Sequence, residues 1–197
     1  MFKRLFDIIF SILGLILVLP LLLVIGPLIK RESPGSAFYR GERIGKQGKV
    51  FRIFKFRSMV LNADKIGGPS TSADDPRLLR IGKILKSHNL DELPQLINVL
   101  RGEMSLVGPR PEVPSEVETY DEETKRIIFS VKPGLTDLAT LENIHEGEIL
   151  RGAQDPHRAY RELIKPRKLE LAREYVKNRS FWLDIKIILK TLKSAIF

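Results

Sequence analysis

The sequence of 197 residues contains no cysteine, one tryptophan and only three histidines. Without cysteine the chain can form no disulfide, thiolate nucleophile or Cys-ligated metal site, and a reducing compartment fits this composition. The histidines, His88, His145 and His157, are scattered, and no two of them have the spacing of a helical ligand pair. This pattern argues against a zinc site.

Acidic residues are also in the minority, because 24 Asp and Glu stand against 33 Lys and Arg and leave a formal charge of +9. Such an excess indicates an anionic partner, which is a nucleic acid, a phosphorylated ligand or an acidic membrane. The alternative is a basic surface that serves only solubility. The length suits one compact domain with an appended element.

Charge is nearly absent from the N-terminal segment, where Asp7 and Ser11 are the only clearly polar residues between Leu5 and Ile29. About 25 residues of helix would reach ~37 Å, which exceeds the ~30 Å of membrane hydrocarbon. The run is too long for the apolar core of a signal peptide, and no small-residue cleavage site follows it.

Pro20 lies in the middle of this run, where it favours a bend, and basic residues flank both of its ends. Basic flanks prefer the cytoplasmic side of a membrane. A helix that enters and leaves by one face satisfies both flanks, so we predict a re-entrant membrane helix over residues 1–30 and one domain over residues 31–197. A straight membrane span and a buried soluble helix are the alternatives.

The C-terminal stretch "SFWLDIKIILKTLKSAIF" has apolar residues at helical spacing and Lys186, Lys190 and Lys193 on another face. An apolar stripe with Trp182 and a row of lysines is typical of a helix in the membrane interface. Packing of the stripe on the protein's own core is the alternative.

The middle of the chain begins with two β-prone runs around "GKQGK", which predict a β-hairpin. In the second run Phe54 and Phe56 alternate with Lys55 and Arg57, so one face is aromatic and the other cationic. Residues 62–77 are polar and predict a loop or a flexible lid, and "RLLRIGKILKSH" after them has helical spacing.

Adjacent carboxylates, Asp91 and Glu92, precede Pro94 in "SHNLDELPQLINVLRG". Since proline is tolerated in the first turn of a helix, we predict a helix from near Asp91 to a glycine stop at Gly102. Acids at a helix start are commonly caps that complement the helix dipole. Two acids side by side can also divide labour, because one can attack or hold a metal while the other moves a proton.

Cations that could neutralise phosphates accompany this pair. Two prolines restrict the backbone around Arg110 in "GPRP", which reduces the entropy lost when the arginine grips an oxyanion. Lys55, Arg57 and Lys86 are further candidates for binding such a substrate. A divalent metal would add positive charge and is usual where pyrophosphate bonds are cut.

Several motifs in a fixed order carry a family resemblance. They are the proline-broken apolar N-terminus, "FKFRSM", "LDELPQLINVLRGEMSLVGPRPE", "VKPGLT" and "EYVKN…DIKI". Together they resemble the small monotopic phosphoglycosyl transferases of the bacterial sugar transferase family. The resemblance implies an α/β fold, mainly α, with an N-terminal re-entrant membrane helix, a compact cytosolic catalytic domain, a small β-hairpin and interfacial amphipathic helices.

The same resemblance implies transfer of a sugar 1-phosphate from a UDP-sugar to undecaprenyl phosphate, with release of UMP. Asp91 matches the nucleophile that forms a phosphosugar ester and Glu92 its partner. Arg110 matches the "GPRP" arginine near the phosphates, and Lys55 matches the lysine of the family segment that "FKFRSM" resembles. The cofactor implied is Mg²⁺ against Asp91. The expected location is the bacterial inner membrane, with the catalytic domain facing the cytoplasm and anionic lipid at the surface.

The chain departs from the family pattern at three places. Leu19 stands before Pro20 where the family often has serine, Thr136 is followed by an unusual "DLATLENIHEGEILRG", and Ala172 replaces an acid. We therefore expect residues 137–175 to shape the sugar or nucleotide pocket. An N-acetylated amino sugar is slightly favoured over galactose or glucose, and His145, Glu146 and Glu148 are solvated or contact the sugar.

Two rival interpretations belong to other functional classes. A membrane-tethered nucleic-acid-binding protein would need exposed, interleaved aromatic and basic residues, and only "FRIFKFR" resembles that pattern. An inactive scaffold of the same fold is disfavoured by retention of the residues that match the family's dyad and its cations.

Overall fold

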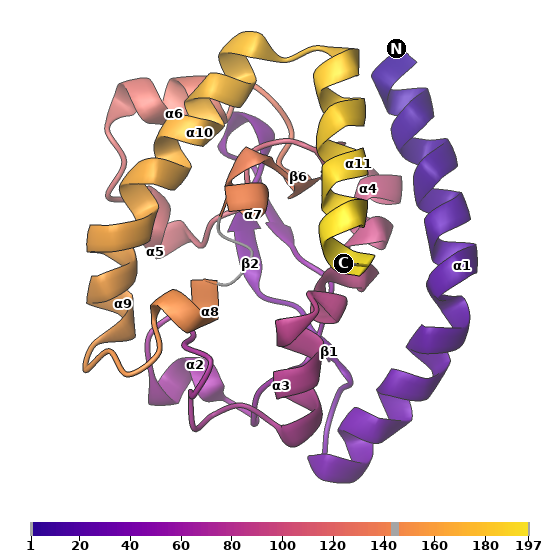
Figure 1. Cartoon of the computed structure of the whole chain (residues 1–197), viewed down its shortest axis with the longest axis vertical. Helices are drawn as coiled ribbons and strands as arrows, with labels where there is room; N and C mark the ends of the chain where they lie inside the picture. The colour runs from indigo at the N-terminus through magenta and orange to yellow at the C-terminus, as the bar shows by residue number, and fades with distance from the viewer. Residues whose placement is uncertain (1, 143–145, 197) are drawn as a thin grey trace.

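The computed structural model describes residues 2–142 and 146–196, and this part of the chain is mainly helical with three two-stranded sheets. The helix α1 (Phe2–Glu32) stands along one side of the body, and α11 (Phe181–Ile196) lies beside its N-terminal half (Figure 1). The predicted mainly α class is confirmed.

The strands are β1 (Phe38–Tyr39), β2 (Glu42–Ile44), β3 (Val50–Arg52), β4 (Lys55–Phe56), β5 (Ser105–Val107) and β6 (Gly134–Thr136). The other α-helices are α2 (Ala63–Ile66), α3 (Arg80–Ser87), α4 (Leu96–Arg101), α5 (Pro114–Val117), α6 (Glu122–Ile128), α7 (Leu138–Glu142), α8 (Glu146–Ile149), α9 (Pro156–Ala159) and α10 (Lys165–Asn178). Two 3₁₀ segments, η1 (Lys46–Gly48) and η2 (Leu90–Gln95), and the π-helical η3 (Tyr160–Ile164) complete the chain's helical elements in the described ranges.

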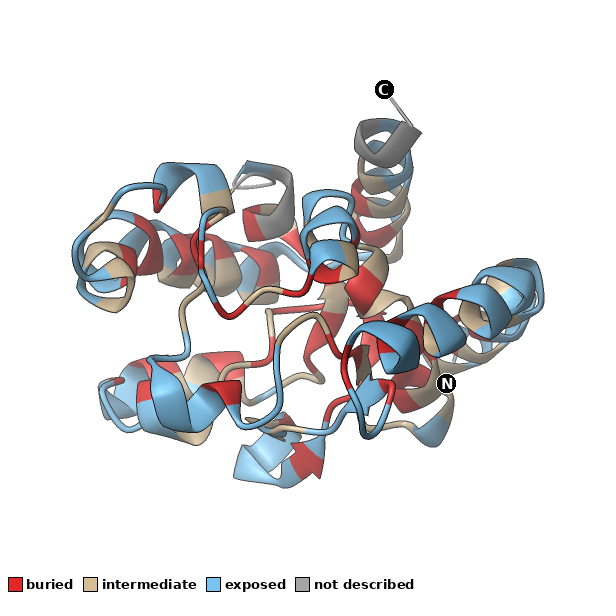
Figure 2. Ribbon diagram, turned by 90° about the horizontal axis from the view of Figure 1, so that it is seen from below, coloured by how far each residue is buried: buried red, intermediate tan, exposed pale blue. Residues whose placement is uncertain are grey.

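One face of α1 packs against the body along the whole helix. The residues on this face recur at helical spacing and are buried or partly buried: Phe6, Asp7, Ser11, Leu15, Val18, Leu22, Ile25 and Ile29. The opposite face is apolar and exposed (Figure 2). The two polar residues of the apolar run therefore mark the side that faces protein, and Asp7 accepts hydrogen bonds of 3.1 Å from Ser105 Oγ and the Leu106 N–H.

Both ends of α1 are attached to the same body. Arg4 donates to the carbonyl oxygens of Val99 and Leu100 at 2.5 and 2.6 Å, which satisfies the C-terminal end of α4. Glu32 at the other end accepts from the first two backbone N–H groups of α3. Hydrogen bonds from charged side chains thus fix the position of both helix ends, which non-directional apolar packing alone would not define.

The break predicted at Pro20 does not interrupt the helix, which continues through both Pro20 and Pro27. A proline removes a single N–H donor and can bend a helix without ending it, and α1 curves in Figure 1. By length and composition α1 is able to cross a membrane. Its re-entrant topology stays a prediction.

The predicted hairpin is confirmed in the paired strands β2 and β3, with Arg43 opposite Phe51, and β1 pairs with β4 beside it. The "FRIFKFR" segment offers no exposed aromatic row, because Phe51 and Phe56 are buried in the core. The guanidinium groups of Arg40 and Arg101 both lie over the ring of Phe54. The nucleic-acid interpretation therefore loses the surface on which it depended.

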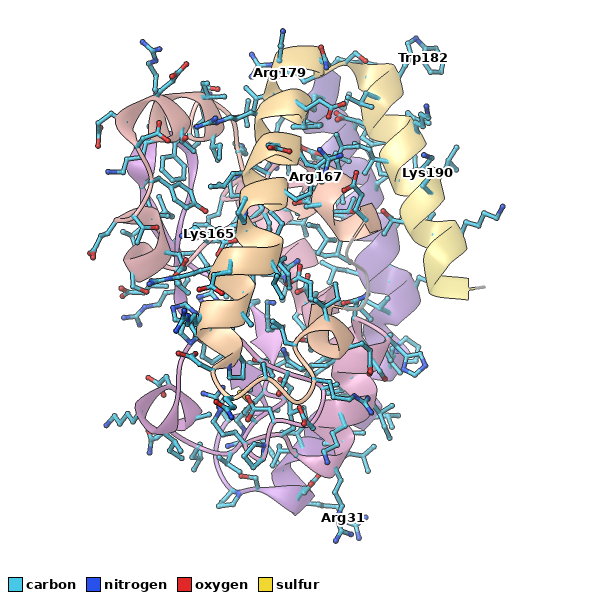
Figure 3. The ribbon with its side chains drawn as sticks, turned by 60° about the vertical axis from the view of Figure 1, so that its left-hand side comes forward. Arg31, Lys165, Arg167, Arg179, Trp182 and Lys190 are labelled. Atoms are coloured by element: carbon cyan, nitrogen blue, oxygen red, sulfur yellow. The ribbon has the colours of Figure 1, made fainter. Side chains whose placement is uncertain are left out.

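The C-terminal helix α11 combines the two alternatives predicted for it, packing on the protein's own core and an exposed apolar surface. Ile187 is buried in the main core, and Leu183 and Ile188 pack against that core. Trp182 and Leu189 remain exposed, and Trp182 projects from the upper end of the molecule in Figure 3. One part of the stripe therefore serves packing, while the other part is a free apolar surface.

The segment predicted as a loop or flexible lid contains α2 and a loop wound around a buried arginine. Arg77 donates to the carbonyl oxygens of Ala63, Gly68 and Ser70 and pairs with Asp75 at 2.7 Å. Five donors in a planar fork suit an arginine to this role. The loop is thereby held in a defined conformation beside the cavity described below.

Candidate active site

The adjacent carboxylates lie on η2, just before α4, and their position depends on local signals in the sequence. Asn89 adopts a left-handed conformation (φ 54°) ahead of η2, and Gly102 does the same (φ 79°) where α4 ends. The predicted start near Asp91 and stop at Gly102 are confirmed. The first turns are 3₁₀ rather than α-helical, and Pro94 lies within them.

Asn98 ties this helical segment to the hairpin. Its buried side chain accepts from the Phe54 N–H at 2.8 Å and donates to the Arg52 carbonyl at 3.0 Å. An amide that offers both a donor and an acceptor can replace a strand partner in this way. The contact places the residue after Phe54, Lys55, where its ammonium group reaches Glu92.

Glu92 is held by two cations. Its Oε1 atom lies 2.6 Å from Lys55 Nζ and 2.6 Å from Arg110 Nη2, and Arg110 Nη1 also donates to Oε2 at 3.4 Å. Burial would raise the pKa of Glu92, but the charges of Arg110 and Lys55 and their hydrogen bonds outweigh it and hold the pKa well below its ordinary value. Glu92 is therefore an ionised anchor.

Arg110 is placed by a close approach of two distant motifs. β5 and β6 pair in parallel, and the Arg110 N–H donates to Asp137 Oδ2 at 3.1 Å. A side chain at Gly108 or Gly134 would collide with the backbone of the other segment, because a Cβ atom would lie within 2.5 Å of it. The glycines of "VGPRP" and "KPGLT" thus allow the contact that aims Arg110 at Glu92.

Asp91 differs from its neighbour. Its side chain is buried, yet it forms no ion pair within 4 Å with any residue in the described ranges. Burial raises the pKa of Asp91 above its ordinary value, although the charge of Lys55 and, more weakly, that of Lys86 oppose this shift. Asp91 is thus a buried carboxylate whose oxygens remain available.

A cavity of about 540 Å³ opens at these residues. Its lining brings together most of the residues singled out from the sequence, namely Lys55, Lys86, Asp91, Glu92 and Arg110. The loop of residues 69–73 and the segment around α8 form other parts of the wall, and Ala73 N donates to the Gly147 carbonyl between them at 2.9 Å.

Arg57 is the candidate binding residue that the structure does not bring to the cavity lining. Its guanidinium donates to the carbonyl oxygens of Pro34 and Ser33 at 2.7 and 2.6 Å, behind the C-terminal end of α1. β4 ends at Phe56, so the alternation that would place Arg57 beside Lys55 stops one residue too early. Arg57 fixes the connection between α1 and β1.

The sequence did not predict several other residues of the cavity lining, because they lie far apart along the chain. They are Glu112, Glu116, Tyr160 and Lys168, to which Ser70 of the loop is added. The sequence signals that could have indicated them are the acids that follow "GPRP", Glu112 and Glu116, and two lysines three residues apart, Lys165 and Lys168. Of the three residues weighed for sugar contact, Glu146 and Glu148 line the cavity, while His145 lies outside the described residues.

Comparison with known proteins decides the family. The sequence model of the family described as bacterial sugar transferase matches residues 1–197. The chain belongs to the bacterial sugar transferase family. The resemblance inferred from the motifs is therefore confirmed, and with it the prediction of a transferase.

Individual members of the family are similar over most of the chain. A UDP-N-acetylgalactosamine-undecaprenyl-phosphate N-acetylgalactosaminephosphotransferase of Aeromonas hydrophila is 36% identical over 98% of this chain and 43% of its own length. A UDP-glucose:undecaprenyl-phosphate glucose-1-phosphate transferase of Klebsiella pneumoniae is 42% identical over 97% and 39%. The exopolysaccharide production protein ExoY of Sinorhizobium fredii is 37% identical over 98% and 84%. The chain therefore spans less than half of two of these sugar transferases.

The carboxylates of the cavity are compatible with the Mg²⁺ ion that the family resemblance implies. No group of three or more His, Asp or Glu side chains converges in the described residues as an all-protein metal site would require. Mg²⁺ often binds through one carboxylate, with substrate phosphates and water as its other ligands. Asp91 suits that role, whereas both oxygens of Glu92 are occupied by cations.

Proposed function

We propose that this chain transfers a sugar 1-phosphate from a UDP-sugar to undecaprenyl phosphate, releases UMP, and does so through a covalent phosphosugar ester of Asp91. The observation that carries the proposal is the unpaired, buried carboxylate of Asp91 beside a carboxylate that two cations immobilise. The names of the relatives support the substrates, because they are sugar-1-phosphate transferases of undecaprenyl phosphate.

The chemistry requires two displacements at one phosphorus atom. An Asp91 oxygen attacks the phosphorus that carries the sugar, and the bond to the bridging pyrophosphate oxygen breaks, so UMP leaves with the electron pair. An oxygen of the lipid phosphate then attacks the same phosphorus. The Asp91–phosphorus bond breaks, the carboxylate is restored, and a lipid diphosphate sugar is formed.

The cations supply most of the stabilisation in this mechanism. Arg110 and Lys55 are held by Glu92 at the edge of the cavity, where they offset the charge that develops on the phosphates. Lys86 adds a further, partly buried charge. Burial lowers the pKa of Lys86, and the negative charge of Asp91 opposes this shift. Mg²⁺, when bound, would polarise the phosphoryl oxygens and balance the charge of Asp91.

Glu92 positions these groups instead of moving a proton. A carboxylate whose pKa is far below its ordinary value is a weak base, and neither of its oxygens is free of a cation. A phosphate nucleophile needs no general base near neutral pH. The two adjacent acids would then divide their labour into attack by Asp91 and orientation by Glu92.

We further propose a monotopic location at the inner membrane, with the cavity on the cytoplasmic side. Both ends of α1 attach to one body, which supports entry and exit by the same face. The exposed apolar side of α1 and the free surface of α11 around Trp182 would meet lipid. A soluble donor and a lipid acceptor both need an active site at the level of the headgroups.

The absence of native cysteine makes this location testable. A single cysteine introduced at position 2 or 32 should be labelled from the cytoplasmic side in both cases. Labelling of only one position would indicate a helix that spans the membrane. Both experiments use the whole chain in native membranes.

A turnover experiment tests the reaction itself. UMP release would be followed for UDP-N-acetylgalactosamine, UDP-galactose and UDP-glucose, each with undecaprenyl phosphate and Mg²⁺. An N-acetylated amino sugar is the first donor to test, and the relatives' names include both classes. Incubation with donor alone should leave phosphorus bonded to Asp91, and a mass spectrum without this adduct would refute the covalent route.

A further inference from the structure

The cavity lining contains two polar groups of different charge. Around Asp91 and Glu92, the three cations Lys55, Lys86 and Arg110 outnumber the two carboxylates. In a second group of the same lining, a single ammonium group faces two carboxylates and a phenol. These residues are Glu112, Glu146, Tyr160 and Lys168.

Lys168 is the centre of this second group. Its ammonium donates to the Tyr160 hydroxyl at 3.0 Å and lies 3.5 Å from Glu112 Oε1 and 3.4 Å from Glu146 Oε1. The Tyr160 hydroxyl in turn donates to Glu112 Oε1 at 3.1 Å. Residues from β5's following loop, η3, α10 and α8 are thereby assembled around one buried cation.

The contacts of this group are loose compared with those of Glu92 and Glu116. Glu92 lies 2.6 Å from each of its cations, and Glu116 lies 2.5 and 2.7 Å from Lys165 and Arg161. Ion pairs at 3.4 and 3.5 Å leave the Lys168 ammonium and the facing carboxylate oxygens able to take better-placed partners. Burial lowers the pKa of Lys168, but Glu112, Tyr160 and Glu146 reverse the shift and raise it, so the ammonium stays charged.

The charge of the group selects the chemistry of its ligand. An excess of carboxylate repels phosphate, which belongs with the cations around Asp91. Hydroxyl and N–H groups suit it, because carboxylates accept from them and an ammonium donates to hydroxyl oxygens. A nucleoside diphosphate sugar carries such groups on its hexose and on its ribose.

We propose that Glu112, Tyr160 and Lys168 form the subsite for the polyhydroxyl part of the donor, which would orient the pyrophosphate towards Asp91. This subsite rests on the proposed transferase function and deepens it. The donor would then lie with its phosphates at the cationic group and its hydroxyl-bearing ring at the acidic one.

Calorimetric titration of the whole chain tests the subsite with two probes, UDP-N-acetylgalactosamine and UMP. Lys168→Met should weaken binding of the UDP-sugar roughly ten- to a hundred-fold, the usual effect of losing a charge-assisted hydrogen bond. Tyr160→Phe should weaken it less, because it removes only a hydroxyl. Lys177→Met is the matched control on the exposed side of α10 and should bind like the wild type.

The two probes distinguish the ring that is bound. Equal weakening of UMP and the UDP-sugar assigns the subsite to ribose, while weakening of the UDP-sugar alone assigns it to the hexose. Unchanged binding of both probes by Lys168→Met and Tyr160→Phe would overturn the proposal, and Tyr160→Phe decides alone if the lysine variant does not fold. Lack of UMP release by the wild-type chain would instead overturn the proposed function.

Discussion

Two carboxylates of this chain, Glu92 and Glu116, are each held by two cations. Glu92 is bonded to Lys55 and Arg110, and Glu116 to Arg161 and Lys165, all at short distances. In both cases burial would raise the pKa, and the paired cations lower it. Of the two, only Glu92 stands next to a buried acid, Asp91, that forms no ion pair in the described part of the chain. Under the proposed mechanism, the neighbouring unpaired acid therefore distinguishes the reactive site from a structural cation cluster.

Asp91→Asn should produce the largest effect on turnover. Removal of the nucleophile should reduce kcat by about 10⁴-fold or more, since residues that act as a unit in covalent catalysis show losses of this size. The same change removes a buried charge without an ion pair, so the free energy of unfolding should rise by about 0.5–2 kcal/mol. UMP release in the presence of Mg²⁺ measures the first effect, and thermal unfolding in the presence of a chelator measures the second.

A wild-type rate for Asp91→Asn would contradict the assignment outright. Loss of both rate and stability would instead make Asp91 a structural residue like Glu116. Opposite signs for the two measurements are therefore the expected mark of the reactive carboxylate.

Glu92→Gln should affect both properties. It leaves Lys55 and Arg110 without their counter-ion, and removal of one partner from a buried pair is expected to destabilise by about 3 kcal/mol. Turnover should fall about 10²–10³-fold, because displaced cations stabilise the transition state less well. Chemical unfolding and UMP release check the variant, and a stable protein with a normal rate would remove Glu92 from the site.

Glu116→Gln should separate the two clusters. Its stability loss should be about 2–3 kcal/mol, close to that of Glu92→Gln, while turnover should fall less than tenfold. The folded-state pKa of Glu116 is depressed, so its stabilising contribution is complete above its ordinary value of 4.5 and is lost as pH falls through the folded pKa. The difference in unfolding free energy from the wild type should accordingly shrink below about pH 4.5.

Urea titrations at several pH values measure this difference. A constant difference down to pH 3, or one that grows as pH falls, would show that the ion pairs of Glu116 do not stabilise the fold.

Local chemistry explains what the sequence could predict. Pro94 lies in the first turns of the helical segment and Gly102 ends it, and the adjacent acids were visible without any tertiary information. The hairpin followed from its glycine-rich turn, and the family motifs supplied the roles. Each of these signals lies within a few residues of the feature that it predicts.

Contacts between distant segments explain what the sequence could not predict. Arg57 was expected beside Lys55 because alternation continues along a strand, but β4 stops and Arg57 turns to the end of α1. Lys168 meets Glu112 across 56 positions of the chain, a contact that no periodicity encodes. The unbroken α1 is a similar case, because one face of the helix packs against the body along its whole length, and the bend that Pro20 favours does not end the helix.

Ser70→Ala should produce the smallest effect, and it tests whether the cluster around Glu116 takes part in the chemistry. The ionised Glu116 can only accept, so His157 donates to it from Nε2 at 3.1 Å, and in the neutral imidazole Nδ1 accepts from the Ser70 hydroxyl at 3.0 Å. This chain of serine, histidine and glutamate resembles a nucleophile with its base, but Arg161 and Lys165 already neutralise Glu116, so we expect a structural clasp on the cavity loop. Loss of one hydrogen bond should reduce the free energy of unfolding by about 0.5–1.5 kcal/mol and raise the donor KM a few-fold with kcat unchanged. Urea unfolding and steady-state kinetics with the UDP-sugar measure both, and a fall in kcat of more than tenfold would show that the second cluster takes part in the chemistry.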